Sequence, residues 1–526
     1  MPAASTLWQR ALDRWQGRVR VRAEDTPGEI ECAKEELVEI CAWLHAEADC
    51  GFGGLIVEER AAGWELRYVF YASDVPGWIH VVQRGPLSDT AFPSISARVP
   101  AADWHEREAE DLFGLKFAGH PYLGDFILHN DAWQENVCPM RKGFDAAKPV
   151  GKREPDPDWR PRRLVHAPGA FVMPIGPVFS GVTESVHFQL ETVGEDVIHA
   201  SSRLFYNYRA IEKIAEGRSV DAVLLLAERF SATTAFAHAL AFCQAAERIA
   251  SLEVPPRARV LRVLLAELER LRHHAGAIQE ICESTGLVVA MSQAAILEED
   301  LLRITGNFCG HRYLFGLAAI GGLTRDFLDG MCGNCVADAR EVGNKLDRLE
   351  AMLRDSSSFL DRLEEVGMVA HVDARRFSLV GPIARGCGLA RDLRKAQPYS
   401  GYEAFQFDVP SESEGDGYAR LRVLFAEARQ SLRIMNQAAA AIPPGAARAA
   451  PADISGGGAL GWVEAPRGAS FHWLRVAEGG TVERYRIVTP SFINWRGFHF
   501  AVEKFAFQDF PIILASFGLS PAENDR

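Results

Sequence analysis

The chain has 526 residues, a net charge of −13 and 48% hydrophobic residues, so it is long enough for one large domain with a small companion or for several domains. The negative charge and the lack of a basic block with interleaved aromatic residues exclude nucleic acid as the expected partner. No apolar run approaches the roughly 20 residues that span a bilayer, and the first residues lack a secretory signal pattern. Ten scattered cysteines therefore favour reduced cytoplasmic thiols, and any membrane association has to come through partners.

The first 130 residues predict a small α+β unit. A helical stretch from Ile30 to Ala48 is followed by strand-like runs at 55–57, 66–71 and 78–82. Residues 131–170 combine prolines with charge and have no apolar period, which predicts a linker.

The segment from Trp104 to Gly114 has the charge spacing of a solvated helix. Glu106 and Glu110 lie one helical turn apart, which places both carboxylates on one face. The same segment, continued to Gly119-His120-Pro121, resembles the signature of the 30 kDa-type (C-like) component of respiratory complex I. Gly124 and Asp125 depart from that family, which has basic residues there.

The clearest predicted helix runs from Arg259 to Glu283, with a leucine stripe along one face. Its adjacent histidines, His273 and His274, point about 100° apart and are therefore unsuited to chelating one metal. The chain has a single C-x-x-C, Cys332 to Cys335, placed before a helix expected to begin near Ala337. Without a second such pair, we interpret these residues as ordinary thiols rather than as a redox motif or half of a metal site.

A stretch from Ala227 to His238 lies between a short apolar run and a predicted helix. It resembles the first metal-binding motif of membrane-bound [NiFe] hydrogenase large subunits, Glu-Arg-Val-Cys-Gly-Ile-Cys-Gly-Phe-Ala-His. Glu228, Arg229 and the run from Phe236 to His238 match, but the two cysteine positions are Ser231 and Thr234. Nickel in such a site needs soft thiolate donors, which neutral hydroxyls do not replace.

From Met173 nearly to the end, the chain resembles the 49 kDa-type (D-like) component of complex I and the related hydrogenase large subunits. The second cysteine pair of a working hydrogenase falls at Ser520 and Glu523. Two further positions have lost a polar group that the relatives carry, a histidine at Phe179 and an acid at Ala277.

The resemblance implies an α+β protein: a small α+β domain at 1–130, a linker at 131–170, and a large, mainly helical domain at 171–526 with small terminal β-sheets. It also implies a fused C/D-type component of a membrane-associated, hydrogenase-4-like or NADH-quinone oxidoreductase. The expected partners are a small B-like Fe–S subunit holding a [4Fe–4S] cluster, a ferredoxin-like Fe–S subunit and membrane antiporter-like subunits, at the cytoplasmic face of the cell membrane. Electrons would come from NAD(P)H or ferredoxin.

In this interpretation the chain binds no cofactor of its own, and its former NiFe pocket accepts a quinone headgroup. Proton delivery is assigned to His238, Glu228 and Glu523, and burial is expected to raise the pKa values of the two glutamates. The remaining expected pocket residues are Phe179, Glu184, His187, Ser231, Thr234 and Ser520.

Two alternatives follow from the same residues. The loss of the metal ligands is also compatible with a non-catalytic scaffold or coupling subunit, which would be insensitive to quinone-site inhibitors. An active [NiFe] hydrogenase is disfavoured, since that chemistry requires thiolate ligands.

Overall fold

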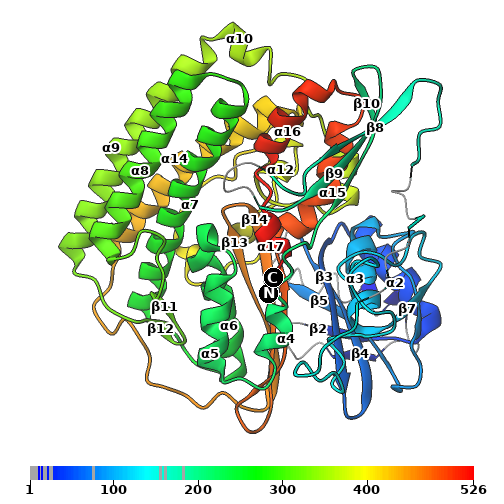
Figure 1. Ribbon diagram of the computed structural model, residues 1–526. Coiled ribbons are helices and arrows are strands. Elements are labelled where there is room, and N and C mark those ends of the chain that lie inside the picture. Colours follow the sequence, from blue (N-terminus) through cyan, green and yellow to red (C-terminus); the bar gives the residue numbers. More distant parts are fainter. Residues whose placement is uncertain are drawn as a thin grey trace.

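The structure, a computed structural model, describes residues 10–11, 13–15, 20–22, 28–73, 77–152, 154, 157–158, 163–179 and 184–526. It consists of a small unit (20–130) and a large unit (170–526) that pack against each other (Figure 1). Between them, the described part of 131–169 contains neither helix nor strand. No helix among the described residues is both long and apolar enough to cross a membrane.

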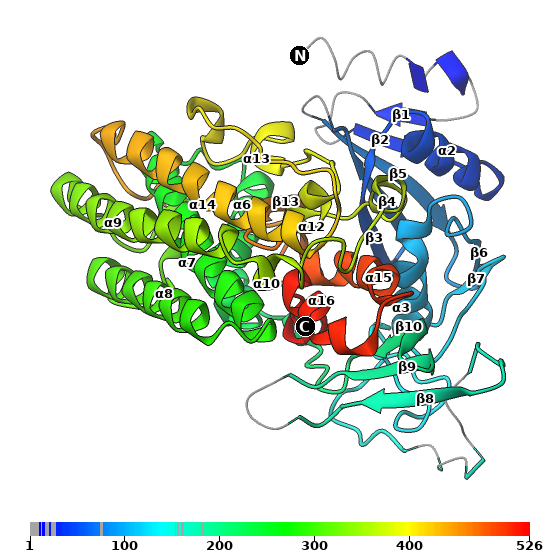
Figure 2. The same cartoon turned by 90° about the horizontal axis from the view of Figure 1, so that it is seen from above.

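The small unit is built on a five-stranded sheet, and its three longest strands, β3, β4 and β5, are mostly buried. Only β2 and β5 pair in parallel; the other neighbours are antiparallel. Two helices contact this sheet (Figure 2), and β3 contacts a strand of the large unit. All nine residues of β4 are buried, as expected when both faces of a sheet are covered. In sheet order the strands are β1 (Arg20–Arg22), β2 (Gly28–Glu31), β5 (Trp78–Gly85), β4 (Gly63–Tyr71) and β3 (Gly51–Arg60), and the helices are α2 (Lys34–Ala46) and α3 (Asp103–Phe113).

The three predicted strands of the small unit are confirmed, but two details of the prediction are wrong. Ile30 does not begin a helix: it pairs with Val81 in the parallel ladder, and α2 starts at Lys34. The α3 helix is also less solvated than its charge spacing suggested. Glu106 is buried and accepts hydrogen bonds from Ser94 Oγ (2.5 Å) and the Ile95 amide (2.8 Å). Its burial raises its pKa to about 7.

Four long helices pack side by side in the large unit (Figure 1). The predicted helix at 259–283 is confirmed as α7, which contacts α8 and α14, while α9 contacts the same two helices. Cys332 and Cys335 lie inside α9 rather than before it, and both are buried. The bounds are α7 (Pro256–Ser284), α8 (Val288–Cys309), α9 (Asp329–Arg354) and α14 (Gly417–Ala440).

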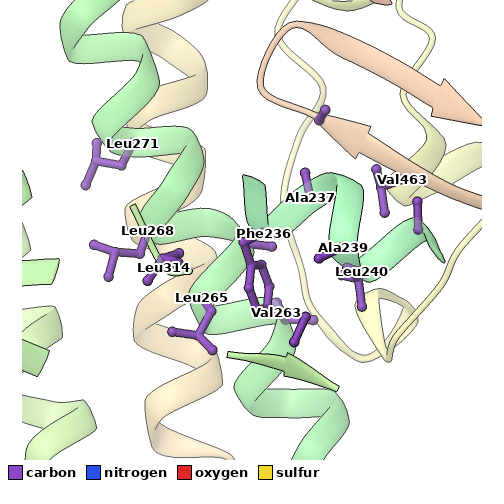
Figure 3. Packing of buried hydrophobic residues seen from close by; sticks show 14 of the residues in the cluster. Phe236, Ala237, Ala239, Leu240, Val263, Leu265, Leu268, Leu271, Leu314 and Val463 are labelled. Carbon is purple, nitrogen blue, oxygen red and sulfur yellow. The ribbon is translucent and has the colours of Figure 1, made fainter. Parts of the chain in front are cut away.

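A shorter helix, α6 (Ala235–Ile249), connects this bundle to a three-stranded antiparallel sheet. Figure 3 shows Phe236 and Leu240 of α6 in the same apolar layer as Val263 and Leu265 of α7. On its other side α6 packs against β13 so closely that a Cβ at Gly461 would lie 1.9 Å from the Ala241 carbonyl oxygen. The sheet consists of β13 (Gly457–Ala465), β14 (Gly468–Val476) and β15 (Val482–Val488).

A second antiparallel sheet, of order β10-β9-β8, contacts the C-terminal helices. These elements are β8 (Ala170–Ile175), β9 (His187–Val193), β10 (Asp196–Arg203), α15 (Pro490–Val502), α16 (Phe510–Phe517) and α17 (Pro521–Asn524). The shorter elements are β6 (Ala91–Pro93), β7 (Lys116–Ala118), α4 (Ile211–Ala215), α5 (Val220–Arg229), β11 (Ala318–Ala319), β12 (Gly322–Leu323), α10 (Ser357–Leu360), α11 (His371–Arg376), α12 (Gly381–Gly386) and α13 (Leu393–Ala396).

Buried ion pairs join the two units. Glu108 of α3 accepts hydrogen bonds from Arg486 of β15 (2.6 Å) and from Arg526 (2.9 Å). Glu212 of α4 pairs with Arg484 (2.9 Å) and Arg486 (3.1 Å). All five side chains are buried, and removing one member would leave an uncompensated charge in the interior. The contact between the units is therefore specific rather than a loose tether.

Candidate functional site: a buried polar cluster around Glu523

The four positions at which the hydrogenase relatives carry cysteine lie near one another. Ser231 and Thr234 lie between α5 and α6, and their hydroxyl oxygens are 2.8 Å apart. Thr234 Oγ1 donates to Glu523 Oε1 at 3.3 Å, and Ser231 Oγ lies 3.5 Å from the same oxygen. Ser520 precedes α17, and its hydroxyl accepts from the Glu523 amide at 3.4 Å. We call Ser231, Thr234, His238, Ser520 and Glu523 the Glu523 cluster; its facing groups are hydroxyls, an imidazole and a carboxylate.

Glu523 is held as a carboxylate. Burial alone would raise its pKa, but the Arg467 guanidinium (3.2 Å), the nearby His238 imidazole and the Ser491 hydroxyl outweigh burial and lower the pKa to about 2. Ser491 donates through its hydroxyl at 2.6 Å. The expectation that burial raises the pKa of Glu523 is therefore wrong, because it left out the buried arginine. At neutral pH this side chain accepts hydrogen bonds and has no proton to deliver.

A buried hydrogen-bonded chain runs from the terminal sheet to His238, which lies beside Glu523. The Tyr485 hydroxyl lies 2.7 Å from His472 Nδ1, and His472 Nε2 lies 3.1 Å from His238 Nδ1. Ser470 Oγ also lies 3.3 Å from His238 Nδ1. The other nitrogen of His238, Nε2, faces Glu523 Oε1 at 3.9 Å.

The two ends of this chain determine the direction of its hydrogen bonds when both imidazoles are neutral. Glu523 only accepts, so the proton of His238 lies on Nε2, and its Nδ1 is the acceptor. At the other end, His472 Nδ1 is the acceptor that the described structure offers to the Tyr485 hydroxyl. His472 therefore carries its proton on Nε2 and donates it to His238. Glu523 therefore selects this arrangement, in which Tyr485 donates to His472 and the His238 N–H faces Glu523 at 3.9 Å.

Glu184 lies at the exposed rim of the Glu523 cluster. Its carboxylate accepts from Ser520 Oγ at 3.1 Å and from the Ala522 amide at 2.8 Å. A carboxylate at the N-terminus of a short helix satisfies donors that have no partner within the helix. Through Ser520, Glu184 thereby connects the rim to the backbone amide of Glu523.

Three of the expected site residues lie apart from the cluster. Glu228 is buried at the end of α5, where it accepts from the Gly316 amide at 2.6 Å. Phe179 is half-buried and packs with the apolar side chains of the second core. His187 on β9 lines a different cavity. No hydrogen bond among the described residues joins any of these three to Ser231, Thr234, His238, Ser520 or Glu523.

Comparisons with known proteins agree with the arrangement of the two units. The family model "Respiratory-chain NADH dehydrogenase, 30 Kd subunit" matches residues 30–150, and "Respiratory-chain NADH dehydrogenase, 49 Kd subunit" matches residues 284–455 and 450–526. Formate hydrogenlyase subunit 5 of Escherichia coli (strain K12) is 31% identical over 449 residues, which cover 84% of this chain and 78% of the relative. The chain belongs to the complex I 30 kDa/49 kDa subunit family.

Two further relatives lie on either side of the division between complex I and hydrogenases. The C/D subunit of the NADH-quinone oxidoreductase of Bdellovibrio bacteriovorus is 32% identical over 432 residues, covering 79% of this chain and 75% of the relative. Hydrogenase-4 component G of Escherichia coli (strain K12) is 30% identical over 461 residues, which cover 85% of this chain and 79% of the relative. This family member is therefore similar to both branches at almost equal identity.

Sequence reasoning missed several residues that complete the site in this complex I-type protein. Arg467, Ser491, His472 and Tyr485 all contact the cluster or its hydrogen-bonded chain, but they carry no distinguishing spacing. Glu269 on α7 was also missed as a site residue. Its carboxylate accepts hydrogen bonds from the amides of Phe236 and Ala237, at 2.8 and 3.0 Å, directly before His238. Burial raises the pKa of Glu269 to about 7, so this group titrates near neutrality.

A cavity of about 20 Å³ lies beside Arg467 and is lined in part by His273, Ala277 and Phe517. This volume is about that of one water molecule. Ala277, where the relatives carry an acid, therefore faces a water-sized space.

Burial raises the pKa values of Cys332 and Cys335 to about 11 and 12, so both are protonated thiols in α9. Among the described residues, no group of three or more His, Cys, Asp or Glu side chains is arranged to hold a metal ion.

Proposed function

We propose that this chain is the fused C/D-type component of a membrane-associated complex I-like or hydrogenase-4-like oxidoreductase and lacks a NiFe centre of its own. The observation that carries the proposal is the contact of Ser231 and Thr234 with Glu523. Three of the four former ligand positions meet there as oxygen groups, and the fourth, Ser520, caps the helix that holds Glu523. Such a donor set does not fit nickel, whose hydrogenase chemistry depends on thiolates.

In this proposal electrons arrive from a [4Fe–4S] cluster in a small B-like partner protein and pass to a quinone-type acceptor. A ferredoxin-like Fe–S subunit and antiporter-like membrane subunits complete the complex at the cytoplasmic face. The acceptor headgroup would bind at the rim near Glu184 and Ser520, between this chain and the Fe–S partner. This placement is supported by the exposure of Glu184 and by its hydrogen bond from Ser520.

Reduction of a quinone to a quinol takes up two electrons and two protons. His238 is the proposed proton carrier: as it releases its Nε2 proton it takes up the proton that His472 donates to Nδ1, so the imidazole stays neutral. Glu523, as a fixed negative charge, favours the tautomer with the proton on Nε2. Glu269 is the proposed proton reservoir: its pKa near 7 lets it exchange a proton at working pH, and it binds the amides that precede His238. Glu228, which is held by Gly316, has no part in this scheme.

A scaffold or coupling role is the second candidate. Two observations favour this role. The side chains of the Glu523 cluster hydrogen-bond to one another, and the cavity beside Arg467 has only the volume of one water molecule. In that role the chain would hold the partner's Fe–S cluster and transmit conformational change to membrane subunits, without binding an acceptor.

Steady-state quinone reduction by the complex purified through this chain separates the two candidates. The substitution His238→Gln keeps a polar side chain but removes the titrating imidazole, and Arg433→Gln on the exposed face of α14 is the matched control. The first proposal predicts a fall in turnover of at least tenfold for His238→Gln, the range general acid catalysis supplies, with the complex intact. Unchanged turnover and insensitivity to quinone-site inhibitors would instead establish the scaffold role.

A further inference from the structure

A second cavity, of about 390 Å³, lies where the small unit meets the large unit. Residues of α3 and the loop after β7 form one side, and β9, β10 and α15 form the other. Its volume falls within the range of small-molecule sites. We call it the interunit pocket; its charged and imidazole lining consists of the basic groups Arg107, Arg203, Arg496, His187, His199 and His499 and the carboxylates Asp103 and Asp125.

Arg107 carries a charge that no carboxylate neutralises at close range. Its Nη2 donates to the carbonyl oxygens of Gly124 (3.1 Å) and Asp125 (3.4 Å). Its guanidinium carbon lies 4.7 Å and 4.4 Å from the ring centres of Tyr122 and Phe126. Within the described chain, no carboxylate oxygen lies within 4 Å of its nitrogens, and its buried Nε has no hydrogen-bond partner. Burial lowers the pKa of Arg107 and outweighs the more distant carboxylates of Asp103 and Asp111.

Arg496 adds a second, weakly compensated guanidinium. Its Nε lies 3.5 Å from Asp103 Oδ2 without forming a hydrogen bond. Asp103 is also 3.2 Å from His120 Nε2, so this one carboxylate serves two basic groups. It therefore leaves Arg107 without a close partner.

The other charged groups around the pocket are paired with their own partners. Arg203 pairs with Asp131 at 2.7 Å and with Asp125 at 3.4 Å. His199 lies 2.8 Å from Glu503. These pairs neutralise one wall of the pocket, so the uncompensated positive charge is concentrated at Arg107 and Arg496.

Two further imidazoles provide hydrogen-bonding groups without fixed charge. His499 Nε2 lies 2.8 Å from Ser202 Oγ, and burial followed by repulsion from Arg496 lowers its pKa to about 3. The ring of His187, half-buried on β9, makes no hydrogen bond to another described side chain and lines the pocket. A neutral imidazole beside a guanidinium suits an anionic oxygen ligand.

We propose that the interunit pocket binds a small phosphate-bearing ligand, with Arg107 and Arg496 as its anion-binding groups and His187 as a hydrogen-bond donor. A guanidinium recognises phosphate oxygens with two parallel hydrogen bonds, and a phosphate group would supply the counter-ion that Arg107 lacks. Because its walls come from both units, a bound ligand would also stabilise their contact. The proposal is independent of the acceptor chemistry at Glu523.

Equilibrium binding to the full-length chain at pH 7 tests this site. The probes are inorganic phosphate and adenosine monophosphate for free phosphates, and phosphatidylglycerol against phosphatidylcholine vesicles for a lipid headgroup. Saturable binding to either type of phosphate, weakened at least about tenfold in Arg107→Gln, is expected from the loss of one charge-assisted hydrogen-bonding pair. The type of probe that binds identifies the source of the phosphate.

Arg433→Gln, on α14 away from the pocket, should retain full binding. His187→Ala provides a second test that does not depend on the folding of the Arg107 variant. It removes a ring that has no hydrogen-bond partner in the described structure. We therefore expect weaker phosphate binding and an unchanged thermal stability of the unliganded chain. Absence of saturable binding, or equal affinity in Arg107→Gln, His187→Ala and Arg433→Gln, would overturn the proposal.

Discussion

His472 Nε2 lies 3.1 Å from His238 Nδ1, and this contact connects the terminal sheet to the Glu523 cluster. Tyr485 hydrogen-bonds the far side of His472, so the phenol supports the arrangement in which His472 donates to His238. The hydrogen bonding of His238 thus depends in part on a residue two hydrogen bonds away. Tyr485 and His472 are therefore positioning residues for His238.

Replacing Tyr485 by Phe tests this relationship. His472 Nδ1 would lose its partner in the interior, which should lower the free energy of unfolding by about 1–3 kcal/mol. The arrangement in which His472 donates to His238 would lose this support, so turnover of the complex should fall and its pH profile should shift. Tyr418→Phe, at a half-buried position on α14, is the control. A pH profile identical to that of the wild type would remove Tyr485 from this role, even if stability fell.

Glu523→Gln should change the dependence of stability on acid. The pKa of Glu523 in the folded chain is about 2, below its usual 4.5, so its ionised form stabilises the fold above pH 4.5. That stabilisation, roughly 3 kcal/mol by linkage, is lost as the pH falls from 4.5 to 2. Urea unfolding of the wild type and the variant should therefore differ most at pH 5–7 and converge toward pH 2. A difference that does not change with pH would contradict an ionised Glu523.

Glu269→Gln should change the pH dependence of stability in the direction opposite to Glu523→Gln. The pKa of Glu269 is raised to about 7, so its contribution to stability is complete below pH 4.5 and is lost as the pH rises through 7. Linkage gives a loss of about 3 kcal/mol across this range in the wild type, which the uncharged variant should not show. Unfolding free energies measured between pH 4.5 and 8 test this directly. Parallel pH curves for wild type and variant would show that Glu269 keeps its ordinary pKa.

Gly461→Ala should disrupt the packing of α6 against β13. The added Cβ would lie 1.9 Å from the Ala241 carbonyl oxygen, which only a backbone shift can relieve. Overpacking of this kind costs about 1–3 kcal/mol, measurable as a lower thermal midpoint. Gly479→Ala is the matched control, since no atom lies within 4 Å of its added Cβ. Equal midpoints for the two variants would contradict the close approach.

The sequence predicted the elements whose patterns are local. Leucine spacing located α7, and the runs at 55–57 and 66–71 located strands, although burial of both sheet faces removes the usual alternation. The contact of Ser231 with Glu523 followed from a family resemblance rather than from periodicity. Arg467 was not predictable in this way: it lies 56 residues before Glu523, and nothing in its own segment indicates that partner.

Charge spacing was the least reliable guide, as Glu106 illustrates. Its position suggested a solvated helix face, yet Ser94 and the Ile95 amide enclose its carboxylate. Tertiary neighbours were likewise left out of the expected pKa of Glu523, so its predicted direction was wrong. The groups around this carboxylate come from three separate segments. Electrostatics at such sites depends on tertiary contacts that no single stretch of sequence contains.

We propose that this complex I-type protein holds oxygen and nitrogen groups, and no nickel, at the position that corresponds to the NiFe site of hydrogenases. Elemental analysis of the native complex, purified through this chain, tests it most directly. We expect iron from the partner subunits and nickel well below one equivalent. Stoichiometric nickel that is lost in Glu523→Gln or His238→Gln would contradict the claim, because the Glu523 cluster would then be a metal site with an unusual ligand set.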